Sequence, residues 1–168
     1  WSEWKLKLNV SADDRERIPT EGPLIVTSNH PFGGIDAMSL LALVESRRSD
    51  VKVLVNEILG QMRFLKGKII LVDVFGDKAK KNARAMREAA RYVRDGGALI
   101  IMPAGAVSHL RLSSRMVTDD PWTSHVGGLA RMSKASVVPA HVEGRNSWFF
   151  QLFGLIHPIL RTILLPNE

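Results

Sequence analysis

The chain has 168 residues, of which 45% are apolar and 24% are charged, and this balance excludes a disordered or collagen-like protein. It contains no cysteine, which excludes thiol catalysis, thiolate metal sites and a disulfide framework. The 23 lysines and arginines exceed the 17 acidic residues, giving a net charge of +6, so the partners to consider are anionic: nucleic acid, a lipid headgroup surface or a phosphorylated substrate.

Apolar runs alternate with helical patterns along the chain. In chain order, the pattern predicts strands at residues 6–10 and 23–28, a helix at 36–47, a strand at 51–55, a helix at 57–65, a strand at 68–74, a helix at 78–94, a strand at 98–102, a helix at 122–133 and a strand at 136–142. Strands that are separated by helices form parallel sheets whose faces are covered. The sequence therefore predicts an α/β fold with a mostly parallel sheet covered by helices.

The chain shows no internal repeat, low-complexity tract or linker, so we expect a single domain over residues 1–168. Its first ten residues do not resemble a signal peptide, and there is no initiator methionine, so we expect a fragment or processed product truncated at both ends. The longest uncharged run, residues 146–160, contains Gly154 and Pro158 and is shorter than the roughly 20 residues that a membrane span needs. An integral membrane protein is therefore not expected.

The predicted helix at residues 78–94 carries most of the excess charge. Its apolar residues step by three or four positions along one face: Ala79, Ala83, Met86, Ala90 and Val93. Its basic residues follow one position later: Lys80, Arg84, Arg87, Arg91 and Arg94. A solvated helix face is the simpler interpretation of this basic stripe, and a dedicated anion site is the alternative. Nucleic-acid binding is not expected, because Tyr92 is the only aromatic residue in this helix.

The segment that leads from the second predicted strand into a helix carries His30 at the strand's carboxyl end, where ligand sites of α/β sheets lie. Pro31 keeps His30 out of helical torsions. Gly33 and Gly34 permit a tight turn that brings Asp36 back toward the imidazole. A carboxylate on one ring nitrogen leaves the other free to take a proton from an alcohol, as a general base does. The simpler alternative makes Asp36 a helix N-cap and His30 an ordinary loop residue.

Three motifs follow one another in the chain: Asn29-His30 with Asp36, then Pro-Ala-Gly-Ala-Val-Ser at residues 103–108, then Val-Pro-Ala-His-Val-Glu-Gly-Arg-Asn-Ser at residues 138–147. In this order they resemble the phospholipid/glycerol acyltransferase superfamily, and within it the hemolysin-like branch that includes ornithine-lipid O-acyltransferases. The resemblance extends over residues 18–166 and implies a glycerolipid acyltransferase-like fold.

The resemblance implies transfer of a fatty acyl group from an acyl carrier protein or coenzyme A thioester to the hydroxyl of a lysolipid, of the lyso-ornithine or 1-acylglycerol-3-phosphate type. His30 matches the family's general base and Asp36 its orienting carboxylate, so no serine nucleophile, metal or other cofactor is implied. The backbone around Gly105 or Gly34 is the candidate for stabilising the oxyanion. The residues expected to contact substrate are Asn29, Gly33, Gly34, Gly105, Ser108, Gly144, Arg145 and Asn146.

The implied place of action is the inner face of the membrane, with the protein cytoplasmic and peripheral. The basic stripe of residues 78–94 would then face anionic headgroups or an acidic acyl carrier protein. The apolar stretch of residues 148–165 would either rest on the bilayer or form an ordinary core element.

This chain departs from the family pattern at two motifs. Around Gly105 it lacks both the glutamate and the arginine of the commoner motif, and Ala106 stands where the related branch often has a glutamate. Another motif commonly ends in an arginine, for which Lys68 or Arg84 would have to substitute. These departures leave open a catalytically impaired homologue that binds lipid or a partner.

Three other polar positions have simple interpretations. His141 lies in the apolar run of residues 137–142, which predicts a core histidine rather than a catalyst. Arg145 fits either a phosphate or carboxylate contact or an exposed position in a turn. Ser108-His109 does not indicate a serine hydrolase, because the chain has no Gly-x-Ser-x-Gly elbow.

Overall fold

The computed structural model describes residues 7–56, 66–72 and 79–156, and a five-stranded parallel sheet lies at its centre. The strand order across the sheet is β3-β2-β4-β1-β7, and every neighbouring pair is parallel. The strands are β1 (Leu24–Ser28), β2 (Val51–Asn56), β3 (Ile69–Val72), β4 (Ala98–Ile101) and β7 (Ser136–Ala140). The α/β prediction is therefore confirmed.

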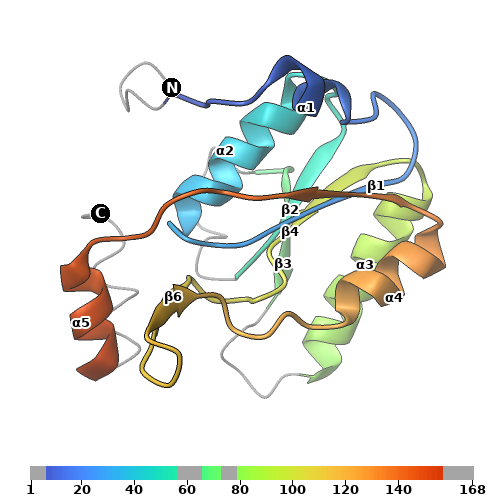
Figure 1. The fold of residues 1–168 in the computed structure, drawn as a ribbon. Helices are drawn as coiled ribbons and strands as arrows, with labels where there is room; N and C mark the ends of the chain where they lie inside the picture. Colours follow the sequence, from blue (N-terminus) through green and yellow to red (C-terminus); the bar gives the residue numbers. More distant parts are fainter. Residues whose placement is uncertain (1–6, 57–65, 73–78, 157–168) are drawn as a thin grey trace.

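Helices cover both faces of this sheet (Figure 1). One face packs against α2 (Gly34–Glu45), and the other packs against α3 (Ala79–Arg94) and α4 (His125–Ser133). Strand β1 contributes to both cores, because successive strand side chains point to opposite faces. Leu24 and Val26 join the core beneath α2, whereas Ile25 joins the core beneath α3 and α4. This burial on both sides explains why β1 reads as a continuous apolar run.

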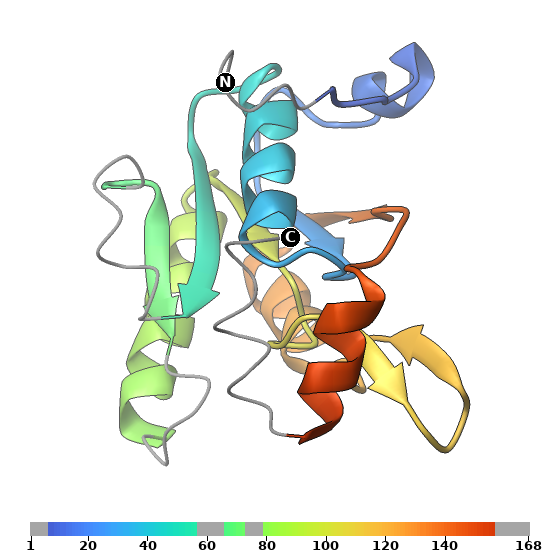
Figure 2. The same ribbon diagram turned by 90° about the vertical axis from the view of Figure 1, so that its left-hand side faces the viewer.

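Two further elements lie beyond the carboxyl ends of the central strands. One is an antiparallel hairpin of β5 (His109–Arg111) and β6 (Met116–Thr118), and the other is α5 (Trp148–Ile156), which packs against β5. Figure 2 shows the hairpin and α5 side by side, near the turn from β1 into α2. Within the described ranges, no helix is long and apolar enough to cross a membrane.

Several predicted elements differ from the structure. Residues 7–10 form no strand, and a short helix, α1 (Ala12–Glu16), follows them. The helix predicted at residues 57–65 and the end of the strand predicted at 68–74 lie outside the described residues. The hairpin and α5 were not predicted, because strands of three residues are too short to show a period and α5 is apolar nearly all round.

The orientation of α3 differs by part of a turn from the predicted one. Its buried side chains are Ala85, Ala89 and Val93, whereas Ala83, which was expected on the buried face, is exposed. The described members of the basic stripe are all exposed: Arg84, Arg87, Arg91 and Arg94. Both interpretations of the stripe, solvated face and anion site, require this exposure.

A buried arginine ties together the loops at the amino-terminal edge of the sheet. Arg48 is 6% exposed, and its guanidinium donates to the carbonyl oxygens of Pro19, Gly22 and Gly96. It also forms a bidentate pair with Asp50, at 2.8 and 2.7 Å. These bonds connect the loops at the amino-terminal ends of the strands. The predicted site lies at the opposite, carboxyl ends.

Candidate active site

The turn from β1 into α2 places Asp36 beneath the loop that carries His30. Gly33 takes a φ of 77°, which a glycine adopts without strain, and α2 begins at the next residue. The Oδ2 atom of Asp36 accepts hydrogen bonds from the backbone N–H groups of Phe32, at 2.8 Å, and Gly33, at 3.0 Å. The N-cap of α2 is Gly33, so the simpler prediction of Asp36 as the N-cap is wrong; as the third residue of the helix, Asp36 instead satisfies donors at its N-terminus through its side chain.

The same carboxylate oxygen faces the imidazole of His30. The distance from Nδ1 of His30 to Oδ2 of Asp36 is 3.1 Å, which is ion-pair range, although the ring is not turned for a linear hydrogen bond. The His30 side chain is 16% exposed and that of Asp36 is fully buried. Asp36 therefore bonds the start of α2 and faces His30 with the same oxygen, and Nε2 is left as the ring nitrogen that can accept a proton.

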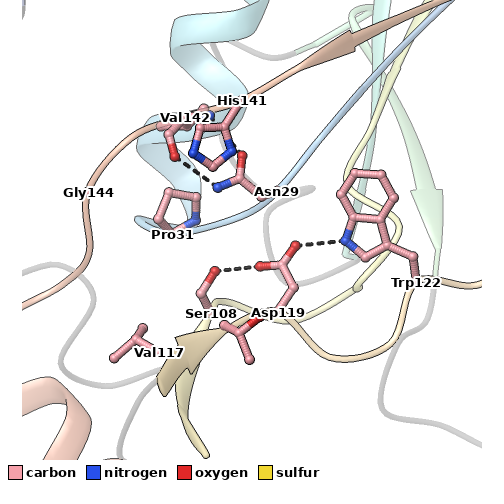
Figure 3. A pocket seen from close by; sticks show the side chains of 10 residues that line it. Asn29, Pro31, Ser108, Val117, Asp119, Trp122, His141, Val142 and Gly144 are labelled. Atoms are coloured by element: carbon pink, nitrogen blue, oxygen red, sulfur yellow. Dashed lines mark hydrogen bonds between the residues drawn. The ribbon is translucent and has the colours of Figure 1, made fainter. Parts of the chain in front are cut away.

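The main chain of His30 is held by residues at the base of the β5–β6 hairpin. Its N–H donates to Oδ1 of Asp119 at 3.2 Å, and its carbonyl oxygen accepts from the N–H of Ser108 at 2.8 Å. The Ser108 hydroxyl donates to Oδ1 of Asp119, and the indole N–H of Trp122 donates to Oδ2 of Asp119 at 2.9 Å (Figure 3). Sequence reasoning missed Asp119 and Trp122, because an Asp-Asp-Pro stretch indicates only a turn.

Asn29 links the carboxyl ends of β1 and β7. Its side-chain N–H donates to the carbonyl oxygen of Val142 at 2.8 Å, and its side-chain oxygen accepts from the N–H of Val142, also at 2.8 Å. Figure 3 shows this amide beside His141. Both ends of the Asn29 amide are therefore engaged with the protein backbone.

A pocket of about 330 Å³ lies at this edge, between the ends of β1 and β7 and the hairpin (Figure 3). Asn29 and Pro31, the neighbours of His30, form one wall, while Ser108 and Asp119 form another. His141 also lines the pocket and is exposed, so the prediction of a core histidine is wrong. The reason is that β7 is an edge strand and His141 follows its last residue.

Of the remaining glycines predicted for the site, Gly144 lines the pocket, whereas Gly105 and Gly34 do not. Gly144 lines the pocket with a φ of 114°, and a Cβ there would lie 2.6 Å from Cζ of Phe32, so only glycine fits. Gly105 has a φ of 70°, and its N–H donates to the carbonyl oxygen of Met102 at 3.1 Å, within its own turn. At Gly34, the first residue of α2, an added Cβ would meet no other atom within 4 Å.

The predicted polar residues after β7 have different environments. Arg145 is exposed, and its guanidinium lies over the ring of Trp148, 4.8 Å from the centroid. Asn146 is 3% exposed, and both atoms of its amide lack a partner in the described part of the chain. Buried amides are rarely left unsatisfied, so a ligand or water contact would be expected here.

Neither residue considered as a substitute cation lines the pocket. Lys68 precedes β3 at the amino-terminal edge of the sheet and pairs with Glu45. Arg84 is exposed on α3. Among the described residues, no group of three or more histidines or acidic residues could hold a metal ion.

Comparison with known proteins identifies the family of this chain. The sequence model of the family described as "Acyltransferase" matches residues 3–161. The chain is 35% identical over 147 residues to a lyso-glycine lipid O-acyltransferase of Bacteroides thetaiotaomicron, and 30% identical over 146 residues to one of Phocaeicola vulgatus. Each alignment covers 86% of this chain, but 52% and 50% of the two relatives, so the chain spans about half their length. The match over nearly all of its residues shows that the chain belongs to the acyltransferase family.

Proposed function

We propose that this chain transfers a fatty acyl group from an acyl carrier protein or coenzyme A thioester to the hydroxyl of a lysolipid, with His30 as the general base. The observation that carries the proposal is the contact between His30 Nδ1 and the buried carboxylate of Asp36, at the carboxyl end of β1 and beside a pocket. The activity in the names of its relatives supports the same reaction.

In the proposed reaction, Nε2 of His30 removes the hydroxyl proton while the lipid oxygen attacks the thioester carbonyl. The carbon–sulfur bond then breaks, and the departing thiolate takes the proton from the imidazolium. The contact with Asp36 stabilises the charged ring between these two steps. Because the N–H groups of Gly33 and Gly105 already donate within the protein, we assign the oxyanion to the backbone N–H of Gly34, the first residue of α2.

The pocket beside His30 is proposed to receive the acceptor's head group. Its volume of about 330 Å³ falls at the lower end of the range for small-molecule sites. The amide of Asn146, which has no partner among the described residues, and the exposed guanidinium of Arg145 are polar groups on the segment that follows Gly144 of the pocket wall. The names of the relatives favour a lyso-glycine lipid, beside the lyso-ornithine and 1-acylglycerol-3-phosphate types that the sequence pattern suggests.

The test is a transfer assay with the purified chain, both thioester donors and the three lysolipids. We expect His30→Ala to lower the rate by at least about 10²-fold, whereas His125→Ala, at an exposed position on α4, should leave it unchanged. Equal rates in the His30→Ala and parent proteins would refute the proposal. Lysolipid binding without transfer by the parent protein would instead support the catalytically impaired homologue.

The outer face of α5 is the proposed membrane contact. Phe150 and Gln151 anchor the helix, since both are buried and the Gln151 side-chain oxygen accepts from the N–H of Leu110 at 2.8 Å. The opposite face exposes large apolar side chains: Trp148, Phe149, Leu152, Phe153 and Leu155. An exposed apolar helix face beside cationic Arg145 is typical of a protein that lies on an anionic bilayer. We therefore propose a peripheral position on a membrane, and its inner face is the side that the sequence resemblance implies.

The basic stripe on α3 is assigned to the donor instead. Helices α3 and α5 lie on different sides of the molecule in both ribbon views (Figures 1 and 2), so one flat bilayer would not contact both faces. An acidic acyl carrier protein is then the better partner for the exposed arginines of α3.

Two variants separate these assignments. Replacing Phe149 and Phe153 by serine should abolish sedimentation with anionic vesicles and leave the KM for soluble acyl carrier protein thioester unchanged. Reversing the charge at Arg84, Arg87 and Arg91 should raise that KM and leave sedimentation unchanged. If charge reversal alters neither, the α3 stripe is an ordinary solvated face. If the serine variant still sediments, α5 is not the membrane contact.

A further inference from the structure

We infer that Asp119 is a positioning residue for His30, an inference that rests on the proposed role of His30 as the base. Asp119 lies 89 positions from His30 in sequence, yet its Oδ1 accepts the His30 N–H. The same oxygen accepts the Ser108 hydroxyl, while the Ser108 N–H donates to the carbonyl oxygen of His30. The two polar groups of the His30 main chain are thus held by two residues that are bonded to each other.

The hairpin explains why these two residues act together. In its register His109 lies opposite Thr118, so Ser108 and Asp119 are the next facing positions at its open end. The loop carrying His30 adds to this open end, with one hydrogen bond to each of the two facing residues. The hairpin is therefore a support whose base fixes the backbone from which the imidazole projects.

The second oxygen of Asp119 fixes the carboxylate itself. Oδ2 accepts the indole N–H of Trp122 at 2.9 Å, so the carboxylate plane is held while Oδ1 faces His30 and Ser108 (Figure 3). The imidazole is in contact with Asp36, which is anchored separately at the start of α2. The contact between Nδ1 and that carboxylate depends on the position of the His30 backbone. Small displacements of a catalytic group lower the reaction rate strongly.

The variants follow from the roles of the two oxygens. Asp119→Ala removes all three hydrogen bonds that the carboxylate accepts, and we expect it to lower kcat about tenfold to hundredfold while the KM for lysolipid changes less than about threefold. Trp122→Phe removes only the bond to Oδ2 and should lower kcat less than Asp119→Ala does. Asp119→Asn keeps an oxygen for His30 and Ser108 but turns an N–H toward the indole N–H, so it should lower kcat. The double variant Asp119→Asn, Trp122→Phe removes that conflict and should recover the kcat of Trp122→Phe.

A second measurement does not depend on turnover. The ring nitrogen NMR signals of His30 report which nitrogen carries the proton. In the parent protein we expect the Nδ1–H form, facing Asp36, and in Asp119→Ala a mixture of both neutral forms. If the parent protein transfers no acyl group, this measurement still tests the inference, and the missing activity counts against the proposed function alone.

Three results would overturn the inference. One is an unchanged kcat together with an unchanged His30 tautomer in Asp119→Ala, which would make Asp119 a structural residue of the hairpin only. Another is a rise confined to the KM for lysolipid, which would make Asp119 a substrate contact in the pocket. The third is a failure of Trp122→Phe to restore kcat to Asp119→Asn, in protein whose thermal unfolding matches the parent.

Discussion

One oxygen of Asp36 has two roles, since it bonds the start of α2 and also faces His30. Two different replacements of Asp36 can separate these roles. In Asp36→Ala the partly buried N–H of Phe32 and the buried N–H of Gly33 lose their acceptor. Each unsatisfied buried donor costs about 1–3 kcal/mol, so the free energy of unfolding should fall by about 2–5 kcal/mol. In a domain of this size that lowers Tm by about 5–15 °C.

Asp36→Asn gives the contrast, because its amide oxygen can still accept both N–H groups. We expect a loss of stability below about 1.5 kcal/mol, but a fall in transfer rate of at least about 10²-fold, since the negative charge beside His30 is gone. Asp95→Asn, at an exposed carboxylate after α3, is the matched control and should change neither quantity.

Thermal unfolding followed by circular dichroism, together with the lysolipid transfer assay, measures both effects. Full activity in Asp36→Asn would refute the role of the charge at His30. An unfolding free energy in Asp36→Ala equal to that of the parent would refute the capping role, because the two N–H groups would then have another acceptor.

Two further predictions concern stability away from the site. Gly97→Ala should destabilise the fold by about 1–3 kcal/mol, because its Cβ would lie 2.5 Å from the ring of Tyr92. Gly128→Ala, in open space on α4, should stabilise the fold by about 0.5–1 kcal/mol. Calorimetry that shows no loss of stability for Gly97→Ala would contradict the packing described. The hydrogen bond from Arg48 lowers the pKa of Asp50 below its ordinary value of 3.8, so this pair stabilises the fold above that pH and the contribution disappears as the pH falls through the lowered pKa. Since Asp50 is half exposed, the effect should stay below about 1 kcal/mol, and urea unfolding should show a weaker acid dependence in Asp50→Asn; identical acid profiles would contradict this.

The parallel sheet and the pairing of His30 with Asp36 could be predicted because each depends on a local pattern. Buried strands appear as apolar runs, and the Pro31 to Gly34 turn brings two residues six positions apart into contact. The contacts that hold this turn in place are of another kind. Asp119 and Val142 meet it from 89 and 113 positions away, and no local pattern contains such pairings.

Two wrong or open interpretations had the same physical cause. His141 stands in an apolar run, but that run lies in an edge strand, so its end meets the pocket rather than the core. The apolar stretch beginning at Trp148 left core and surface as alternatives, and in α5 both occur, with Phe150 buried and Phe149 exposed. Hydrophobicity along the chain does not show which face of a helix or strand packs against another element.

The side chain of Asn29 imitates a peptide group, with one donor and one acceptor aligned on Val142. It extends the pairing of β1 with β7 beyond the last backbone pair, Ser28 with Ala140. The main chain already turns away from the sheet at His30, the residue that follows Asn29. Deamidation of this residue would replace the donor by a second acceptor facing the Val142 carbonyl. The loss of one amide nitrogen would therefore loosen the edge strand and the pocket wall together.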